Sequence, residues 1–160
     1  MTQKVTLQQL LFFALILTTI AACQKTEDLI DPPSTGELLA DGAWVLKAQT
    51  VDPAIEVNGV MISNEYNQIP SCTRDDLYNF NESGSYTLEE GATKCATNDP
   101  QIIETGSWLY QEDNAFFQLL ANNTPFNLTL TTLNRDEMVW VQTWIDNGVN
   151  YTRTYTLESE

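Results

Sequence analysis

Residues 138–157, MVWVQTWIDNGVNYTRTYTL, alternate between two kinds of side chain and contain one strong turn signal. Asn147-Gly148 is a preferred dipeptide of two-residue type I′ hairpin turns, because both turn positions need a positive φ. Folding at this turn puts aromatic and long side chains on one face, and threonines and valines on the other. The facing pairs on the first face are Trp144 with Tyr151, Gln142 with Arg153, Trp140 with Tyr155, and Met138 with Leu157. A slip of one residue would mix the two faces, so turn and pattern predict the same β-hairpin register.

Alternating segments of the same kind recur along the chain from residue 43, with turn-forming residues between them. We find no segment of helical period with convincing length in this region. The predicted strands are 43–51, 76–81, 85–90, 102–111, 115–121, 126–133, 137–145 and 149–158. Eight consecutive strands with mostly short links predict an all-β fold, an eight-stranded antiparallel up-and-down barrel. We assign this domain to residues 42–160.

The first 22 residues have the three parts of a signal peptide. Lys4 is the charged start, LLFFALIL at 10–17 is the apolar part, and small residues lead to Ala22. The residues IAAC, at 20–23, resemble the signal of bacterial lipoproteins, in which the cysteine is acylated and becomes the mature N-terminus. We therefore expect Cys23 to carry palmitate-type lipid, which would anchor the protein to the membrane of the cell envelope. The expected place is the outer membrane, on its periplasmic or surface face; the alternative is a secretory leader cut after Ala22.

Residues 23–41 follow the leader and are rich in acidic residues, with two prolines and little apolar patterning. Such a composition buries too little apolar surface to fold alone, so it predicts a flexible acidic tether. The alternative is an N-terminal strand or helix packed on the domain, which Leu38 and Leu39 would favour.

Two cysteines remain if Cys23 is lipidated, and we predict that Cys72 and Cys95 form a disulfide. Exported proteins meet an oxidising compartment, which favours disulfide formation. The residues Asn81-Glu-Ser-Gly84 suit a type I turn with Gly84 in the left-handed position. The hairpin that folds there brings the two cysteines together at its open end. The alternative is a pair of free thiols.

Charge and composition narrow the function classes. The chain carries 22 acidic against 7 basic residues, a net charge of −15, so it lacks the cations that would neutralise nucleic-acid phosphates. It has no histidine, which excludes Ser-His-Asp and Cys-His catalysis and histidine-based metal sites. Neighbouring carboxylates such as Asp75 and Asp76 would point to opposite faces of a strand and would not act as a catalytic pair. We expect no enzymatic activity, no cofactor, no metal site and no nucleic-acid partner.

Several short motifs resemble the lipocalin family. Gly42-x-Trp44 begins the first predicted strand and Arg153 lies on the last one. In addition, LYNFNESGSYTLEEGATKC at 77–95, followed by ETGSW at 104–108, is similar to the lipocalin-like domain of Bacteroidetes lipoproteins. The likeness covers about residues 42–158. It implies a calycin barrel in which Arg153 packs across Trp44 and closes one end.

A barrel of eight strands either fills with side chains or holds one small ligand. We predict a site for a small hydrophobic ligand, in which Arg153 would bind a ligand carboxylate beside tyrosine hydroxyls. The candidate lining residues are Tyr78, Phe80, Tyr86, Trp108, Phe126, Trp140, Gln142, Trp144, Tyr151, Arg153 and Tyr155.

Two other interpretations stay open. In the first, the same aromatic residues fill the core and leave no ligand site. In the second, the protein is an interaction or inhibitor module for an envelope protein partner and acts through its loops. The main candidate loop is the long link 52–71, which would serve as a lid, as a partner site or only as a surface loop.

Overall fold

The β8–β9 hairpin has the register that its sequence predicts. The structure, a computed structural model, describes residues 31–160; Cys23 and the predicted signal peptide lie outside them. Asn147 and Gly148 have φ values of 49° and 79°, as a type I′ turn requires. Trp140 faces Tyr155 and Gln142 faces Arg153, so the predicted pairs are confirmed.

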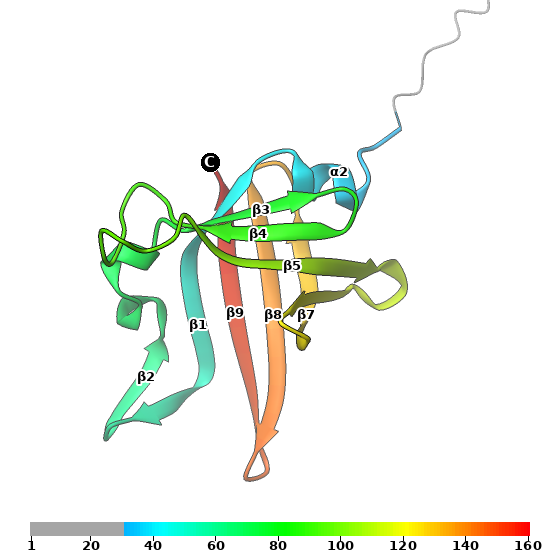
Figure 1. Cartoon of the computed structure of the whole chain (residues 1–160). Coiled ribbons are helices and arrows are strands. Elements are labelled where there is room, and N and C mark those ends of the chain that lie inside the picture. The colour runs from blue at the N-terminus through cyan, green and yellow to red at the C-terminus, as the bar shows by residue number, and fades with distance from the viewer. Residues whose placement is uncertain (1–30) are drawn as a thin grey trace, which may run out of the picture. The chain divides into compact units, whose positions relative to one another are not determined.

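The described part of the chain contains one α-helix, three 3₁₀ turns and nine strands (Figure 1). The helix is α2 (Thr35–Ala40), and the 3₁₀ turns are η1 (Tyr66–Gln68), η2 (Ser71–Thr73) and η3 (Glu112–Asn114). The strands are β1 (Ala43–Val57), β2 (Val60–Asn64), β3 (Leu77–Asn81), β4 (Ser85–Glu89), β5 (Ile102–Gln111), β6 (Phe116–Ala121), β7 (Thr124–Leu133), β8 (Glu137–Asp146) and β9 (Val149–Ser159).

Eight of these strands close into an antiparallel barrel. Strands β3 to β9 pair in chain order, and β1 pairs with both β3 and β9. The predicted eight-stranded up-and-down barrel is therefore confirmed. The closing contact between β1 and β3 is short, running from Ala43 opposite Asn79 to Val45 opposite Leu77. Figure 1 shows β3, β4 and β5 crossing in front of strands β9, β8 and β7.

The ninth strand, β2, lies in the segment that the sequence analysis treats as a long link. It forms a hairpin with the far end of β1, with Val57 opposite Val60 and Ile55 opposite Ile62. Its turn is Asn58-Gly59, with φ values of 52° and 80°, the same chemistry as the turn between β8 and β9. The prediction that 52–71 is only a loop is therefore wrong for residues 52–64.

The barrel interior is mainly aromatic. Phe80, Phe117 and Trp140 contact one another, with ring centroids 5.6 to 6.3 Å apart. Met138 and Leu157, a predicted facing pair, are both completely buried. Each such side chain contributes about 1.5–3 kcal/mol when it leaves water, so this cluster is a main source of stability.

Part of the predicted tether is instead a helix that packs on the barrel. Ser34 and Glu37 form a capping box at the start of α2, which satisfies backbone groups that would otherwise lack partners. Leu39 is completely buried in the core, and the indole Nε1 of Trp44 donates a hydrogen bond to its carbonyl at 2.9 Å. The prediction of a flexible tether is therefore wrong for residues 35–40, and the alternative of a packed helix is correct there. The capping box and the buried side chain of Leu39 stabilise this short helix on the barrel.

The predicted contact between Trp44 and Arg153 is also wrong. Trp44 lies opposite Ser159 on β9, whereas Arg153 lies opposite Val51, well along β1 toward its other end. The Arg153 guanidinium instead lies over the ring of Trp144, 4.8 Å from its centroid. The strand register alone separates the two predicted partners.

The predicted Cys72–Cys95 disulfide is confirmed, with the two Cα atoms 5.1 Å apart. Gly84 has a φ of 90° and its N–H donates to the carbonyl of Asn81 at 2.9 Å, which is the predicted turn. The hairpin β3–β4 therefore brings the cysteine-bearing segments together, as its sequence predicts.

Candidate functional site

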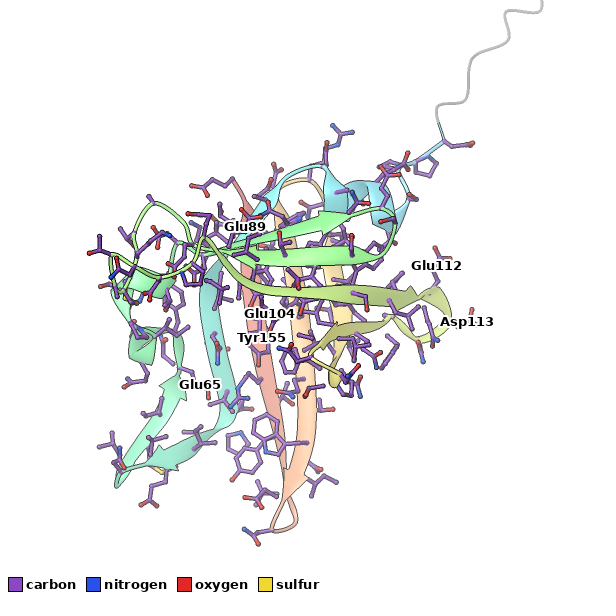
Figure 2. All side chains as sticks on the ribbon, in the orientation of Figure 1. Glu65, Glu89, Glu104, Glu112, Asp113 and Tyr155 are labelled. Carbon is purple, nitrogen blue, oxygen red and sulfur yellow. A yellow bond between two sulfur atoms is a disulfide. The ribbon has the colours of Figure 1, made fainter. Side chains whose placement is uncertain are left out.

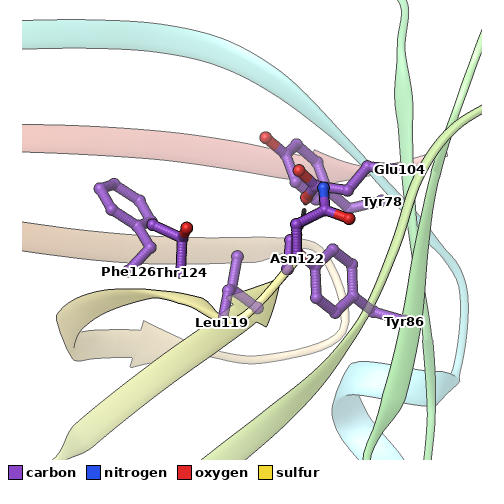
Figure 3. Close-up of a pocket in the computed structure, with 8 residues that line it drawn as sticks. Tyr78, Tyr86, Glu104, Leu119, Asn122, Thr124 and Phe126 are labelled. Atoms are coloured by element: carbon purple, nitrogen blue, oxygen red, sulfur yellow. Dashed lines mark hydrogen bonds between the residues drawn. The ribbon is translucent and has the colours of Figure 1, made fainter.

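A pocket of about 350 Å³ lies on the inner side of strands β3 to β7 and is partly open to solvent. Figure 3 shows the side chains around it, which come from five strands and the turn between β6 and β7. The lining residues are Tyr78, Tyr86, Glu104, Leu119, Ala121, Asn122, Thr124 and Phe126. Aromatic rings and aliphatic groups make about half of the wall, and polar groups, including the carboxylate of Glu104, make the other half.

Alternation along the strands explains why these residues meet. On β5 the even-numbered residues are the less exposed ones, so Glu104, Gly106 and Trp108 share the inner face. Gly106 lies directly under the ring of Tyr86. A Cβ at Gly106 would lie 2.5 Å from Tyr86 Cε1 and 2.4 Å from the carbonyl oxygen of Leu120. The missing side chain therefore makes room for the tyrosine ring beside the pocket.

Glu104 and Tyr86 form a hydrogen-bonded pair at the pocket wall. The Tyr86 hydroxyl donates to Glu104 Oε1 at 2.5 Å, and no group of residues 31–160 donates to Oε2. Burial, the hydrogen bond to Glu104 and the charge of Glu104 raise the pKa of the Tyr86 phenol. Burial, followed by the negative charge of Glu104, raises the pKa of Tyr78 to about 12. Both phenols therefore stay protonated near neutral pH, and the single hydrogen of the Tyr86 hydroxyl is already used in the bond to Glu104.

A second cluster of polar side chains surrounds Arg153 on β9. Its Nε and Nη2 donate to the two oxygens of Glu65, at 2.5 and 2.7 Å, and its Nη1 donates to Gln142 Oε1 at 3.3 Å. Gln49 Nε2 also donates to Glu65, at 3.1 Å. Burial opposes ionisation of Glu65, but the hydrogen bonds from Arg153 and Gln49 outweigh it and the pKa of Glu65 is lowered. A carboxylate of the protein itself thus occupies the place that we predicted for a ligand carboxylate.

A pair of carboxyl groups lies beside β3 and β4, outside the pocket. Leu77 faces Glu89, so Asp76 and Glu90 follow as neighbours at the same end of the two strands. Asp76 Oδ1 and Glu90 Oε2 are buried without a hydrogen-bond partner among the described residues. Burial and the charge of Glu90 raise the pKa of Asp76 to about 6. The sequence analysis considered Asp75 with Asp76 and missed this cross-strand pair.

The structure divides the predicted ligand-binding residues into three groups. Tyr78, Tyr86 and Phe126 line the pocket. Gln142, Trp144 and Tyr151 lie with Arg153, where the rings of Trp144 and Tyr151 stack at 5.2 Å. The remaining residues pack in or against the core: Phe80, Trp108, Trp140 and Tyr155.

The sequence analysis missed five lining residues, of which Glu104 is the most important. The sequence did contain a signal for Glu104, because it lies two and four residues before Gly106 and Trp108 and so shares their face of a predicted strand. Leu119 and Ala121 follow the same alternation on β6. Thr124 shares the alternation of Phe126 on β7 but lies just before the predicted strand 126–133. Asn122 had no such signal, since it lies in the tight turn that follows β6.

None of the helices in residues 31–160 is long and apolar enough to cross a membrane. The same residues contain no group of three or more cysteine and acidic side chains placed to hold a metal ion.

The chain is similar to known proteins in structure and in sequence. Bovine odorant-binding protein, in a complex with a selenium-containing odorant, is 12% identical; the match covers 81% of this chain and 75% of that chain, with a TM-score of 0.41. The bovine lipocalin allergen Bos d 2 is 10% identical, with 79% and 76% of the two chains covered and a TM-score of 0.40. No curated protein matches. The family described as "Lipocalin-like domain" matches residues 41–140, from the turn before Trp44 to Trp140 on β8. Since this match covers more than half of the sequence, the chain belongs to the family of lipocalin-like domains.

Proposed function

We propose that this protein binds a small, largely hydrophobic ligand in the pocket between β3 and β7. The observation that carries the proposal is the pocket itself, whose volume of about 350 Å³ is that of a small-molecule site. The rings of Tyr78, Tyr86 and Phe126 and the side chain of Leu119 offer an apolar wall. Polar groups make the other half of the wall, and among them Glu104 and Asn122 would orient the ligand. The role we propose is binding, without catalysis and without a cofactor.

The packing of the core limits the size of this ligand. Phe80, Phe117 and Trp140 are buried to 93% or more and fill the barrel beyond the pocket. A long chain that runs along the whole barrel axis would have to displace them, and this would cost several kcal/mol of packing. The expected ligand is therefore compact, of about one to three rings.

A fluorescent probe tests this function. N-phenyl-1-naphthylamine is neutral and apolar at pH 7 and emits strongly only when it leaves water. We expect saturable binding with one site per chain. Ala121 lines the pocket, so Ala121→Trp should fill it and abolish the signal. Gln118→Trp, on the outer face of the same strand, is the matched control and should bind as the wild type does. Unsaturable emission, or equal binding by both variants, would contradict the proposal.

The export and lipid anchor remain part of this proposal. Cys23 lies outside the described residues, and the support for acylation is the IAAC motif after an apolar leader. The Cys72–Cys95 disulfide supports export, because such bonds persist in oxidising compartments. We propose a cell-envelope protein held at the outer membrane by lipid on Cys23. Cys23→Ser should move the protein from the membrane fraction to the soluble fraction; equal membrane association of both forms would contradict the anchor.

The β1–β2 hairpin favours a second candidate function, a module that binds an envelope protein. Strand β2 is the edge of the sheet and pairs only with β1 among the described strands. Val60 and Met61 are 61% and 63% exposed, and the segment 58–64, NGVMISN, carries no charge. Unpaired edge strands are templates for an added strand. Met61→Lys should abolish capture of such a partner and leave probe binding in the pocket unchanged.

A further inference from the structure

Glu104 directs a carboxylate into the pocket, and only half of its hydrogen-bonding capacity is used within the described residues. Oε1 accepts the Tyr86 hydroxyl, while Oε2 accepts from no group of residues 31–160. Figure 3 shows the Glu104 side chain among the residues that line the pocket. A partly buried carboxylate has lost hydration, so a ligand group that donates to it gains more than it would in water.

No basic side chain of the described residues forms an ion pair with Glu104. Five basic residues lie in residues 31–160, and none forms an ion pair with it. Arg153 is bound to Glu65, and Arg135 pairs with Asp41. The other three are Lys47, which lies exposed on β1, Arg74, which donates to the carbonyls of Ile69 and Asn67, and Lys94, which donates to that of Asp99.

The rest of the pocket wall suits a cation that carries an apolar substituent. Tyr78, Tyr86 and Phe126 present aromatic rings, whose faces attract ammonium groups and also contact hydrocarbon. Burial and, after it, the charge of Glu104 raise the pKa of Tyr78, in agreement with the place of both side chains in the pocket wall. The net charge of −15 also concentrates cations near the protein and repels anions.

From these observations we infer that the pocket selects small organic amines, with the ammonium group on Glu104 and the apolar part against Tyr78, Tyr86 and Phe126. This inference rests on the proposed ligand-binding function and specifies its ligand class. A neutral ligand of the same shape would make the apolar contacts and forgo the ion pair. An anionic ligand would meet repulsion from Glu104.

Three probes that share one skeleton test the inference on the full-length protein. They are phenethylamine, which is cationic at pH 7, 2-phenylethanol, which is neutral, and phenylacetate, which is anionic. Binding is measured by titration calorimetry and by displacement of N-phenyl-1-naphthylamine. We expect phenethylamine to bind at least about tenfold more tightly than 2-phenylethanol, because a hydrogen bond to a charged group is worth more than a neutral one. Phenylacetate should bind most weakly.

Two variants separate the ion pair from general electrostatics. Glu104→Gln keeps the shape and an acceptor for Tyr86 but removes the charge, so the preference for phenethylamine should disappear. Glu112→Gln removes one charge from the exposed turn after β5, at a distance from the pocket (Figure 2), and should keep the wild-type preference. A circular dichroism spectrum and melting curve establish that both variants are folded.

The outcomes distinguish this inference from the function on which it rests. If 2-phenylethanol binds as tightly as phenethylamine, or if Glu104→Gln keeps the preference, the amine inference is overturned and the hydrophobic pocket stands. If neither the three probes nor N-phenyl-1-naphthylamine bind, both the amine inference and the proposed ligand-binding function are overturned. An amine preference lost equally in Glu104→Gln and Glu112→Gln would reflect net charge alone and would also overturn the inference.

Discussion

Arg153 on β9 binds Glu65 through two hydrogen bonds, of 2.5 and 2.7 Å, although 88 residues separate them in sequence. This paired geometry ties the segment after β2 to the inner face of the barrel. The arginine therefore fastens one part of the fold to another, where the sequence suggested a site for a ligand carboxylate.

Breaking this ion pair should destabilise the domain. The two side chains are only 23% and 14% exposed, so Glu65→Gln would leave the Arg153 charge largely desolvated and unpaired. We expect a loss of about 2 kcal/mol in the free energy of unfolding, below the full cost of a deeply buried pair because both groups retain some solvent. Arg153→Lys should lose nearly as much, since lysine lacks the fork that binds both oxygens. Urea denaturation followed by tryptophan fluorescence measures both.

The exposed pair of Arg135 and Asp41 gives a control, with side chains 72% and 51% exposed. Asp41→Asn should change the free energy of unfolding by less than about 0.5 kcal/mol. Equal effects of Asp41→Asn and Glu65→Gln would contradict the special role of the buried pair.

The same pair should make stability depend on pH in acid. The pKa of Glu65 is lowered in the folded protein from its ordinary value of 4.5, so the folded state binds the proton less readily than the unfolded state. The stabilisation is fully present above pH 4.5 and is lost as the pH falls through the lower folded value. The difference in unfolding free energy between the wild type and Glu65→Gln should therefore shrink below pH 4.5. A difference that grows with acid would contradict this sign.

Asp76 should show the opposite behaviour. Burial and the charge of Glu90 raise its folded pKa to about 6 from 3.8, so ionisation opposes folding, and the cost appears as the pH rises between these values. Asp76→Asn should raise the free energy of unfolding by about 3 kcal/mol above pH 7 and leave it nearly unchanged at pH 3. Chemical denaturation at the two pH values measures this.

Asp75, its sequence neighbour, gives the contrast. Its carboxylate accepts the backbone N–H and the hydroxyl of Thr93, both at 2.8 Å, and the Thr93 hydroxyl lowers its pKa. Asp75→Asn should therefore destabilise the protein at neutral pH, where Asp76→Asn stabilises it. The same sign for both substitutions would contradict the assignment.

Gly106 should be essential to the shape of the pocket. Gly106→Ala would push a Cβ against the Leu120 carbonyl and the Tyr86 ring, so we expect a loss of about 2 kcal/mol in stability, as in other overpacked sites. The displaced Tyr86 should also weaken binding of N-phenyl-1-naphthylamine. In Gly36→Ala, by contrast, the added Cβ meets only ordinary contacts in α2 and should be neutral or slightly stabilising. Equal tolerance of both changes would contradict the close approach at Gly106.

Turn chemistry and alternation were enough to predict most of the barrel from the sequence. Asn147-Gly148 fixed the register of β8 and β9. The same dipeptide at Asn58-Gly59 marks the turn between β1 and β2, so it was a signal in the sequence for the strand β2. A packed helix at α2 was only the alternative to a flexible tether, because six residues give too little periodicity; its signals were the capping box at Ser34 and the apolar Leu38 and Leu39.

The site was harder to predict, because its contacts join distant strands. Alternation finds which residues face inward, such as Glu104, but not which of them leave space between them. The pair of Glu65 and Arg153 depends on how the segment after β2 folds back, and no local pattern encodes that distance. Resemblance to a family pattern misled for Trp44 and Arg153, since the register places them at different levels of the barrel.

The most direct test of the account is the place where N-phenyl-1-naphthylamine sits. Intermolecular nuclear Overhauser contacts, measured on the saturated complex, report which side chains touch the probe. We predict contacts from the probe to the rings of Tyr78, Tyr86 and Phe126. Contacts to Val60 and Met61 on the edge strand instead, with none to these rings, would contradict a ligand pocket inside the barrel.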